Sequence, residues 1–116
     1  MKKNRETAAI KELLERVPGI QSAFIHGPCS KNLKHSKDGV EITVVGAPDP
    51  AELDEIVSKV EEKLAKPADV TLFTVRELQE RIVLKEPLVT RILKEPKVVL
   101  VERALLANWI STHYND

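Results

Sequence analysis

Apolar residues recur along the chain at two spacings, which separate predicted helices from predicted strands. One buried helix face is predicted by apolar residues at i, i+3, i+4 and i+7: Ile10, Leu13, Leu14 and Val17. Residues 40–44 alternate with a period of two, which is typical of a strand with one face in the core. Over the whole chain these patterns predict the order α-β-β-α-β-α-α-β-α, with strands at 20–26, 40–44, 69–73 and 98–101.

Capping residues and prolines mark where the predicted helices begin and end. Asp49 lies where its carboxylate can cap the second helix. Thr74 and Glu77 have the spacing of a capping box, which opens the third helix. Pro87 interrupts that helix and Pro96 ends the short helical segment after it, because proline has no N–H for the helical ladder.

The composition indicates one small domain. The 116 residues include eighteen Lys+Arg and eighteen Asp+Glu, so the formal net charge is zero. Dedicated nucleic-acid and anionic-membrane binders draw affinity from a net basic surface, which a neutral chain lacks. Cys29 is the single cysteine, which excludes an internal disulfide, and no apolar run approaches the roughly 20 residues that span a bilayer. We expect a soluble cytoplasmic protein with no membrane partner.

A glycine-led turn between two strands contains the candidate chemistry. Gly27-Pro28 ends the strand over 20–26, and Glu41 lies early in the next strand. Backbone N–H groups at such a turn can hold phosphate oxygens, and carboxylates on adjacent strands can hold Mg²⁺. A turn that only reverses the chain is the other interpretation of Gly27-Pro28. His26, at the strand end, is interpreted as a base, as a ligand or simply as a polar residue that closes the strand.

The loop between these two strands is basic. It carries Lys31, Lys34, His35 and Lys37. These side chains could contact a triphosphate or an RNA backbone. The alternative is a solvated loop whose charges are balanced elsewhere in the neutral chain.

Two predicted strands between residues 24 and 46 each end in glycine. The first ends as Phe24-Ile25-His26-Gly27, and the second, which contains an acid, is Gly39-Val-Glu41-Ile-Thr-Val-Val-Gly46. This arrangement resembles the minimal nucleotidyltransferases of the DNA polymerase beta superfamily. The order of elements extends the likeness over about residues 8–101. The resemblance implies an α/β fold of the nucleotidyltransferase (polymerase beta-like) type, with a small mixed β-sheet flanked by helices, over residues 1–101.

The phosphate-binding part of the family's motif is only partly present. Gly27 matches the motif glycine, but Pro28 stands at the serine position and offers neither a hydroxyl nor an N–H to a phosphate. The resemblance leaves Gly27, Ser30 and Lys31 as candidate phosphate-binding residues.

The family's three metal-binding carboxylates are also incomplete. The first falls on Gly39, the second on Glu41 and the third on Asp69, while Asp38 could substitute if Gly39 formed a bulge. Loss of a carboxylate that bridges two ions predicts weak metal binding. Aspartate at both position 39 and position 41 is therefore expected to strengthen metal-dependent nucleotide binding.

Two functions are compatible with this motif. The first is a degenerate nucleotidyltransferase-fold protein that binds a protein partner or an NTP without catalysis and needs no cofactor. Some members of the family are antitoxins beside a helical toxin, so the resemblance implies a toxin-antitoxin-like partner. The alternative is an active enzyme that moves a nucleoside monophosphate from an NTP to an acceptor. Glu41 and Asp69, with Asp38 as a weaker third ligand, would then hold Mg²⁺ or Mn²⁺.

Residues 102–116 extend beyond the segment that resembles the family. They are predicted to form a helix with an apolar stripe made of Leu105, Leu106, Trp109 and Ile110. A small domain has little core left to cover such a stripe, so we expect the helix to pack on the domain or to form a homodimer.

Overall fold

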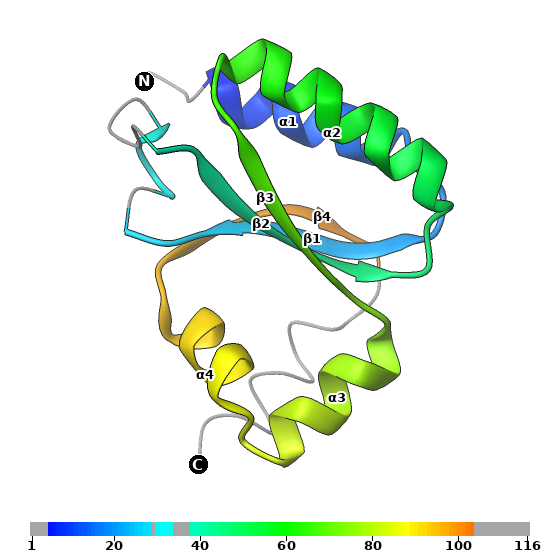
Figure 1. Cartoon of the computed structure of the whole chain (residues 1–116), viewed down its shortest axis with the longest axis vertical. Coiled ribbons are helices and arrows are strands. Elements are labelled where there is room, and N and C mark those ends of the chain that lie inside the picture. Colours follow the sequence, from blue (N-terminus) through cyan, green and yellow to red (C-terminus); the bar gives the residue numbers. More distant parts are fainter. Residues whose placement is uncertain (1–4, 29, 34–37, 104–116) are drawn as a thin grey trace.

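The computed structural model describes residues 5–28, 30–33 and 38–103. Its elements follow the predicted order: α1 (Arg5–Glu15), β1 (Ile20–His26), β2 (Val40–Gly46), α2 (Pro50–Leu64), β3 (Ala68–Phe73), α3 (Val75–Val83), α4 (Pro87–Lys94) and β4 (Lys97–Glu102) (Figure 1). The helix predicted to begin at Glu102 lies almost wholly outside the described residues. Its expected first residue belongs instead to β4, because Glu102 continues the ladder opposite Ser22 of β1.

The four strands form one mixed sheet in the order β3-β2-β1-β4. β1 is antiparallel to both β2 and β4, whereas β2 and β3 are parallel. A parallel pair needs a crossover connection, which α2 supplies. The α/β class and the small mixed sheet flanked by helices are therefore confirmed.

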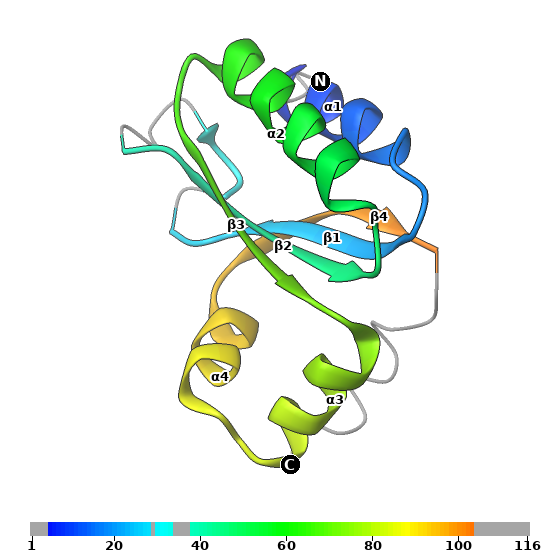
Figure 2. The same cartoon turned by 45° about the vertical axis from the view of Figure 1, so that its right-hand side comes forward.

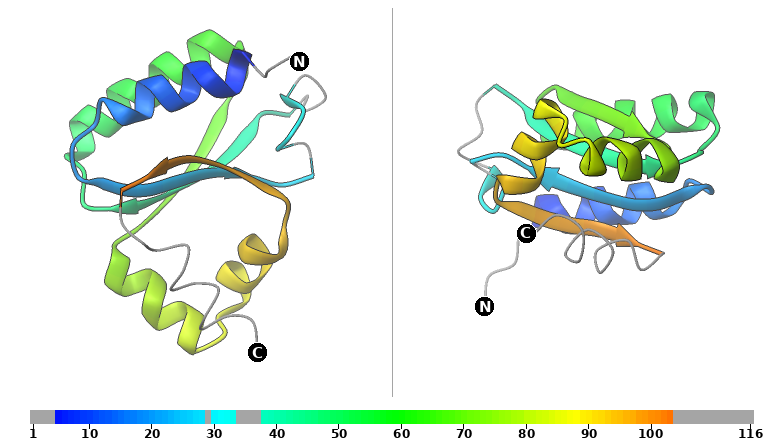
Figure 3. Two further views of the ribbon diagram at one scale, coloured as in Figure 1. Left: turned by 180° about the vertical axis from the view of Figure 1, so that it is seen from behind. Right: turned by 90° about the horizontal axis from the view of Figure 1, so that it is seen from below.

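Helices cover both faces of this sheet. α1 and α2 lie together on one face, and α3 and α4 lie on the other (Figure 2). The view from behind shows the same three layers (Figure 3). Ile42 and Val44 of β2 belong to the core with α1 and α2, whereas Val45 packs with α3 and α4. Since side chains alternate along a strand, Glu41 and Thr43 also face α3 and α4.

Local signals define the helix starts as predicted. The Asp49 carboxylate accepts a hydrogen bond from the Glu52 N–H at the start of α2. Thr74 and Glu77 form both bonds of the capping box at the start of α3. Within the three described ranges, none of the helices has the length and apolar character needed to cross a bilayer.

Candidate functional site

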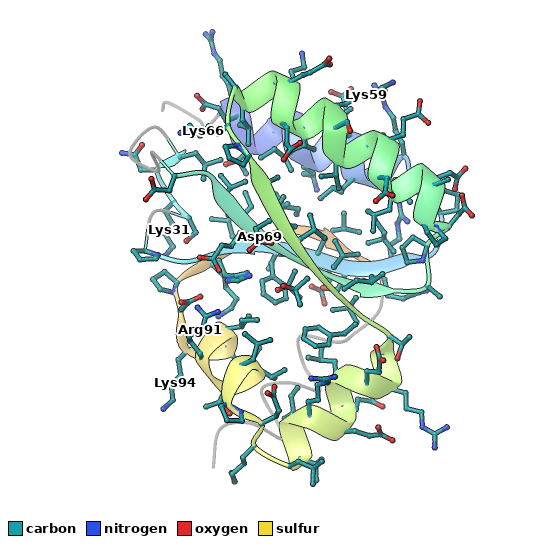
Figure 4. All side chains as sticks on the ribbon, viewed as in Figure 1. Lys31, Lys59, Lys66, Asp69, Arg91 and Lys94 are labelled. Atoms are coloured by element: carbon teal, nitrogen blue, oxygen red, sulfur yellow. The ribbon has the colours of Figure 1, made fainter. Side chains whose placement is uncertain are left out.

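A row of ionisable residues crosses the sheet where β1 ends. His26 is paired with Lys97 of β4 on one side and with Glu41 of β2 on the other, and Glu41 is paired in turn with Asp69 of β3. Residues paired across neighbouring strands share a face of the sheet, so this row faces α3 and α4. Figure 4 shows Asp69 on β3 and Arg91 on α4. The fold thus brings the predicted residues Glu41 and Asp69 into adjacent positions.

His26 lies at the centre of this row and is buried. Its Nδ1 lies 3.0 Å from Oε1 of Glu95 and 3.8 Å from Oε1 of Glu41. Its Nε2 lies 3.0 Å from the hydroxyl of Thr43, which is also buried. His26 therefore does more than close a strand, because both of its ring nitrogens contact polar side chains from other elements.

Both carboxylate oxygens of Glu95 have partners. Its Oε1 faces His26, and its Oε2 accepts a hydrogen bond of 2.8 Å from Nη1 of Arg91. Partial burial alone would raise the pKa of Glu95, but the hydrogen bond with His26 and the charge of Arg91 outweigh it and lower that pKa. The carboxylate of Glu95 is therefore stabilised in its ionised form.

Lys97 lies beside this carboxylate without forming an ion pair to its oxygens. Its ammonium group donates to the backbone carbonyls of Leu93 and Glu95, at 2.8 and 2.7 Å. Burial lowers the pKa of Lys97, although the nearby Glu95 charge opposes the change.

Gly39 occupies a backbone conformation that side chains other than glycine's rarely adopt. Its φ is +117°, and a Cβ built there would lie 2.5 Å from the carbonyl oxygen of Pro67. That same oxygen accepts the N–H of Val40, 3.0 Å away, which fixes the close approach. Aspartate at position 39, which was predicted with aspartate at position 41 to strengthen metal-dependent nucleotide binding, would strain the backbone and require the Pro67 segment to move.

The other predicted ligands lie apart from His26. Asp38 and Asp69 are both exposed. In the described part of the chain, one group of three side chains could hold a metal ion, and it consists of His26, Glu41 and Glu95. Glu41 is thus shared between the predicted set and this group, whereas Asp38 and Asp69 are not members of it.

Two backbone N–H groups of the turn after β1 donate hydrogen bonds to backbone carbonyls. The N–H of Gly27 donates to the carbonyl of Pro96, and the N–H of Ser30 donates to the carbonyl of Gly27, both at 3.1 Å. Ser30 is buried and Lys31 is exposed. The hydroxyl of Ser30 has no hydrogen-bond partner among the described residues. Cys29, Lys34, His35 and Lys37 lie outside the described residues.

The sequence reasoning missed Glu95. The available signal was its spacing from Arg91, which predicts an i,i+4 ion pair on a helix. That pair is present, but the second contact joins Glu95 to His26, 69 positions earlier in the chain. No local pattern encodes such a pairing.

Comparisons with known proteins assign the fold. No family model matches the sequence, and no curated protein matches it. Three solved structures each match 94% of this chain. One is the toxin-antitoxin MntA-HpeT with two aspartate-to-glutamate substitutions (TM-score 0.55, 23% identity, 82% of that chain covered). The second is a toxin-antitoxin with AMP-PNP (0.54, 22%, 82%). The third is a tri-AMPylated Shewanella oneidensis HEPN toxin in complex with MNT antitoxin (0.52, 20%, 79%).

These likenesses, at 20 to 23% identity, establish the fold. The chain has the nucleotidyltransferase fold of the MNT proteins. The resemblance noted in the sequence is therefore confirmed at the level of the fold.

Proposed function

We propose that this chain is a degenerate nucleotidyltransferase-fold protein that acts by binding a protein partner and transfers no nucleotide. The observation that carries the proposal is the backbone at Gly39, where the family's resemblance places the first metal-binding aspartate. The φ of Gly39 is +117°, and a built Cβ would lie 2.5 Å from the carbonyl oxygen of Pro67, so a side chain at this position would strain the backbone.

Two-metal nucleotidyl transfer depends on carboxylates that hold two ions roughly 4 Å apart. Position 39 cannot supply one without a change of backbone. Glu41 directs a carboxylate oxygen towards His26, at 3.8 Å, and Asp69 is an exposed residue on the neighbouring strand. The residues present do not fit a two-ion magnesium site, since Mg²⁺ demands near-ideal octahedral oxygen ligands.

The turn after β1 is also a poor phosphate cradle. The N–H of Gly27 already donates to the carbonyl of Pro96, and Pro28 has no N–H to offer a phosphate. Of the predicted phosphate-binding residues, Ser30 is buried, and its N–H is used within the turn. We therefore expect an NTP to bind weakly, through Lys31 and the basic loop.

A protein partner is supported by two observations. The structural neighbours come from toxin-antitoxin structures, one of them a HEPN toxin in complex with MNT antitoxin. At the C-terminal end of α3, Val83 and the capping residue Leu84 are 64% and 77% exposed, and they line a surface cavity of about 350 Å³ with Gln79 and Glu80. Adjacent exposed apolar side chains beside a cavity offer a protein partner an apolar contact. We propose a helical HEPN-type toxin as the partner.

The second candidate is an active metal-dependent nucleotidyltransferase. The observation that favours it is the pairing of Glu41 with Asp69, which places two carboxylates on one face of the sheet. In that function Glu41 and Asp69 would hold Mg²⁺ or Mn²⁺, and the acceptor would be the protein partner or another substrate.

A transfer assay separates the two candidates. The full chain is incubated with each labelled NTP and Mg²⁺ or Mn²⁺, and nucleotide binding is measured in parallel by isothermal titration. We expect no transfer by the wild type. Transfer with Mg²⁺ that is lost in Asp69→Asn would overturn the proposal and establish the enzyme.

Partner binding is tested by co-expression with a HEPN-type protein from the same genome, followed by size-exclusion chromatography. We expect a complex that Val83→Ser with Leu84→Ser weakens. Lys59→Ser on α2, an exposed position on the opposite side of the sheet, is the matched control and should leave the complex intact. A HEPN-type protein that elutes separately from the wild-type chain argues against this partner.

A further inference from the structure

We propose that His26, Glu41 and Glu95 form a binding site for a single Zn²⁺ ion. Each residue offers one donor atom, and the three donor atoms all lie within 4.8 Å of one another. The set contains neither Gly39 nor Asp69, so it differs from the two-ion carboxylate site that the family resemblance implies. It also includes an imidazole, which suits zinc and does not suit magnesium.

The distances between the donors lie near those of tetrahedral zinc. Zinc bonds to histidine nitrogen and to carboxylate oxygen are about 2.0–2.2 Å long, so two ligands of a tetrahedral ion lie about 3.3–3.5 Å apart. Nδ1 of His26 lies 3.0 Å from Oε1 of Glu95 and 3.8 Å from Oε1 of Glu41. These two distances bracket the required value. The donor atoms of the two carboxylates lie within 4.8 Å of each other, so the half-exposed Glu41 side chain moves toward Glu95 to close the site around an ion.

Neighbouring side chains orient two of the three ligands. Nε2 of His26 lies 3.0 Å from the hydroxyl of buried Thr43, so with a bound ion in place of the Nδ1 proton, an Nε2–H can donate to that oxygen while the Nδ1 lone pair faces the ion. Arg91 donates to Oε2 of Glu95 at 2.8 Å and leaves Oε1 for the ion. Metal-binding histidines and carboxylates in proteins are commonly held by such secondary hydrogen bonds.

Burial and charge define the kind of site. The His26 side chain is 2% exposed and that of Glu95 is 20% exposed, while the Glu41 side chain is 43% exposed and can adjust to an ion. Two carboxylates balance the charge of Zn²⁺, although the nearby cations Arg91 and Lys97 reduce the affinity. Three protein ligands leave one position of a tetrahedral ion for water, on the open side next to Glu41. The ion would join β1, β2 and the α4–β4 connection.

The test uses the full chain without an affinity tag, titrated with Zn²⁺ against a chromophoric chelator. We expect one ion per chain and, because ligands that bind the fold raise its stability, a thermal midpoint higher by about 5 °C or more at saturating Zn²⁺. Co²⁺ in place of Zn²⁺ should give the visible absorption of a four-coordinate ion.

Two conservative variants and a matched control make the test specific. Glu41→Gln and Glu95→Gln remove one ligand charge each and should weaken Zn²⁺ binding by more than tenfold. Glu62→Gln makes the same substitution at an exposed position of α2, on the other face of the sheet, and should leave the affinity unchanged. Glu41 is half-exposed, so its variant should fold even if the Glu95 variant is impaired.

Two results would overturn the assignment. One is the absence of a bound ion in the wild type. The other is binding of equal strength in Glu41→Gln and wild type, which would place the ion on other donors such as Cys29, His35 or His113.

Discussion

Gly27 and Gly39 have almost the same backbone angle but different surroundings. Their φ values are +114° and +117°. Among the described residues, a Cβ at Gly27 would meet Oε2 of Glu41, at 3.8 Å, whereas one at Gly39 would lie 2.5 Å from the carbonyl oxygen of Pro67. Gly27→Ala should therefore lower the free energy of unfolding by about 1–3 kcal/mol through conformational strain alone. Gly39→Ala should cost about 1–3 kcal/mol more, because the clash adds to the strain.

Urea denaturation of both variants and the wild type measures this difference. Equal losses for the two glycines would mean that Pro67 moves aside at little cost. Aspartate at position 39 could then restore a metal ligand, and the contact with Pro67 would no longer indicate a degenerate site.

Pro28 lies in the same turn as Gly27 but carries little of its structure. It is exposed, and Gly27 takes the unusual backbone angle at the start of the turn. Pro28→Ser should therefore change stability only slightly, because proline at an exposed turn acts mainly by restricting the unfolded chain. A thermal midpoint lower by more than about 8 °C, roughly 1–2 kcal/mol for a domain of this size, would contradict this expectation.

The sequence reveals the presence of Gly39 but not the reason for it. A glycine in place of an acid is compatible both with a lost ligand and with a required backbone angle. The contact that distinguishes these readings is with Pro67, on the connection between α2 and β3. The contacts of His26 could not be predicted from the sequence either, because its partners Thr43 and Glu95 belong to other parts of the fold.

Among the secondary-structure elements, α1 is tied to the end of β4 by one arginine. The Arg103 guanidinium donates to the carbonyls of Glu15, Val17 and Ile20, at 2.6, 3.2 and 3.2 Å. The last carbonyls of a helix have no partners within it, and a cation there is favourable. Arg103→Ala should therefore lower the free energy of unfolding by about 1–2 kcal/mol.

Arg103→Lys is the matched control for this contact. Lysine keeps the charge but cannot reach three carbonyls with a planar group, so it should recover only part of the loss. Chemical denaturation of the two variants measures the difference. Full recovery by lysine would mean that charge alone, and not the branched set of hydrogen bonds, stabilises the junction.

Elements with local signals were predictable from the sequence, and contacts between elements were not. Asp49 accepts a hydrogen bond from the N–H of Glu52, and Thr74 pairs with Glu77. Each pair lies within four positions in the sequence, so the spacing alone predicts the starts of α2 and α3. β4 was predicted too short, because its last residue is fixed by pairing with Ser22 of β1. Strand pairing depends on a partner far away in the chain, which periodicity does not identify.

For the molecule as a whole, self-association remains a prediction. The stripe of Leu105, Leu106, Trp109 and Ile110 needs a surface to cover it, and Val99 on the edge strand β4 is 50% exposed. We expect the full chain to sediment as a dimer and a chain that ends at Arg103 to sediment as a monomer. Truncation after Arg103, rather than before it, preserves the hydrogen bonds to α1, so a change in mass is not caused by damage to the fold.

A full-length variant serves as the control for chain length. Leu105→Ser with Trp109→Ser keeps all 116 residues but removes half of the apolar stripe, so it should dissociate like the shorter chain. Circular dichroism of each variant verifies that the domain stays folded. A monomeric wild-type chain would show that the stripe does not mediate self-association. The stripe would then be expected to pack either on the domain itself or on the partner protein. Co-expression with the HEPN-type protein would distinguish these two arrangements.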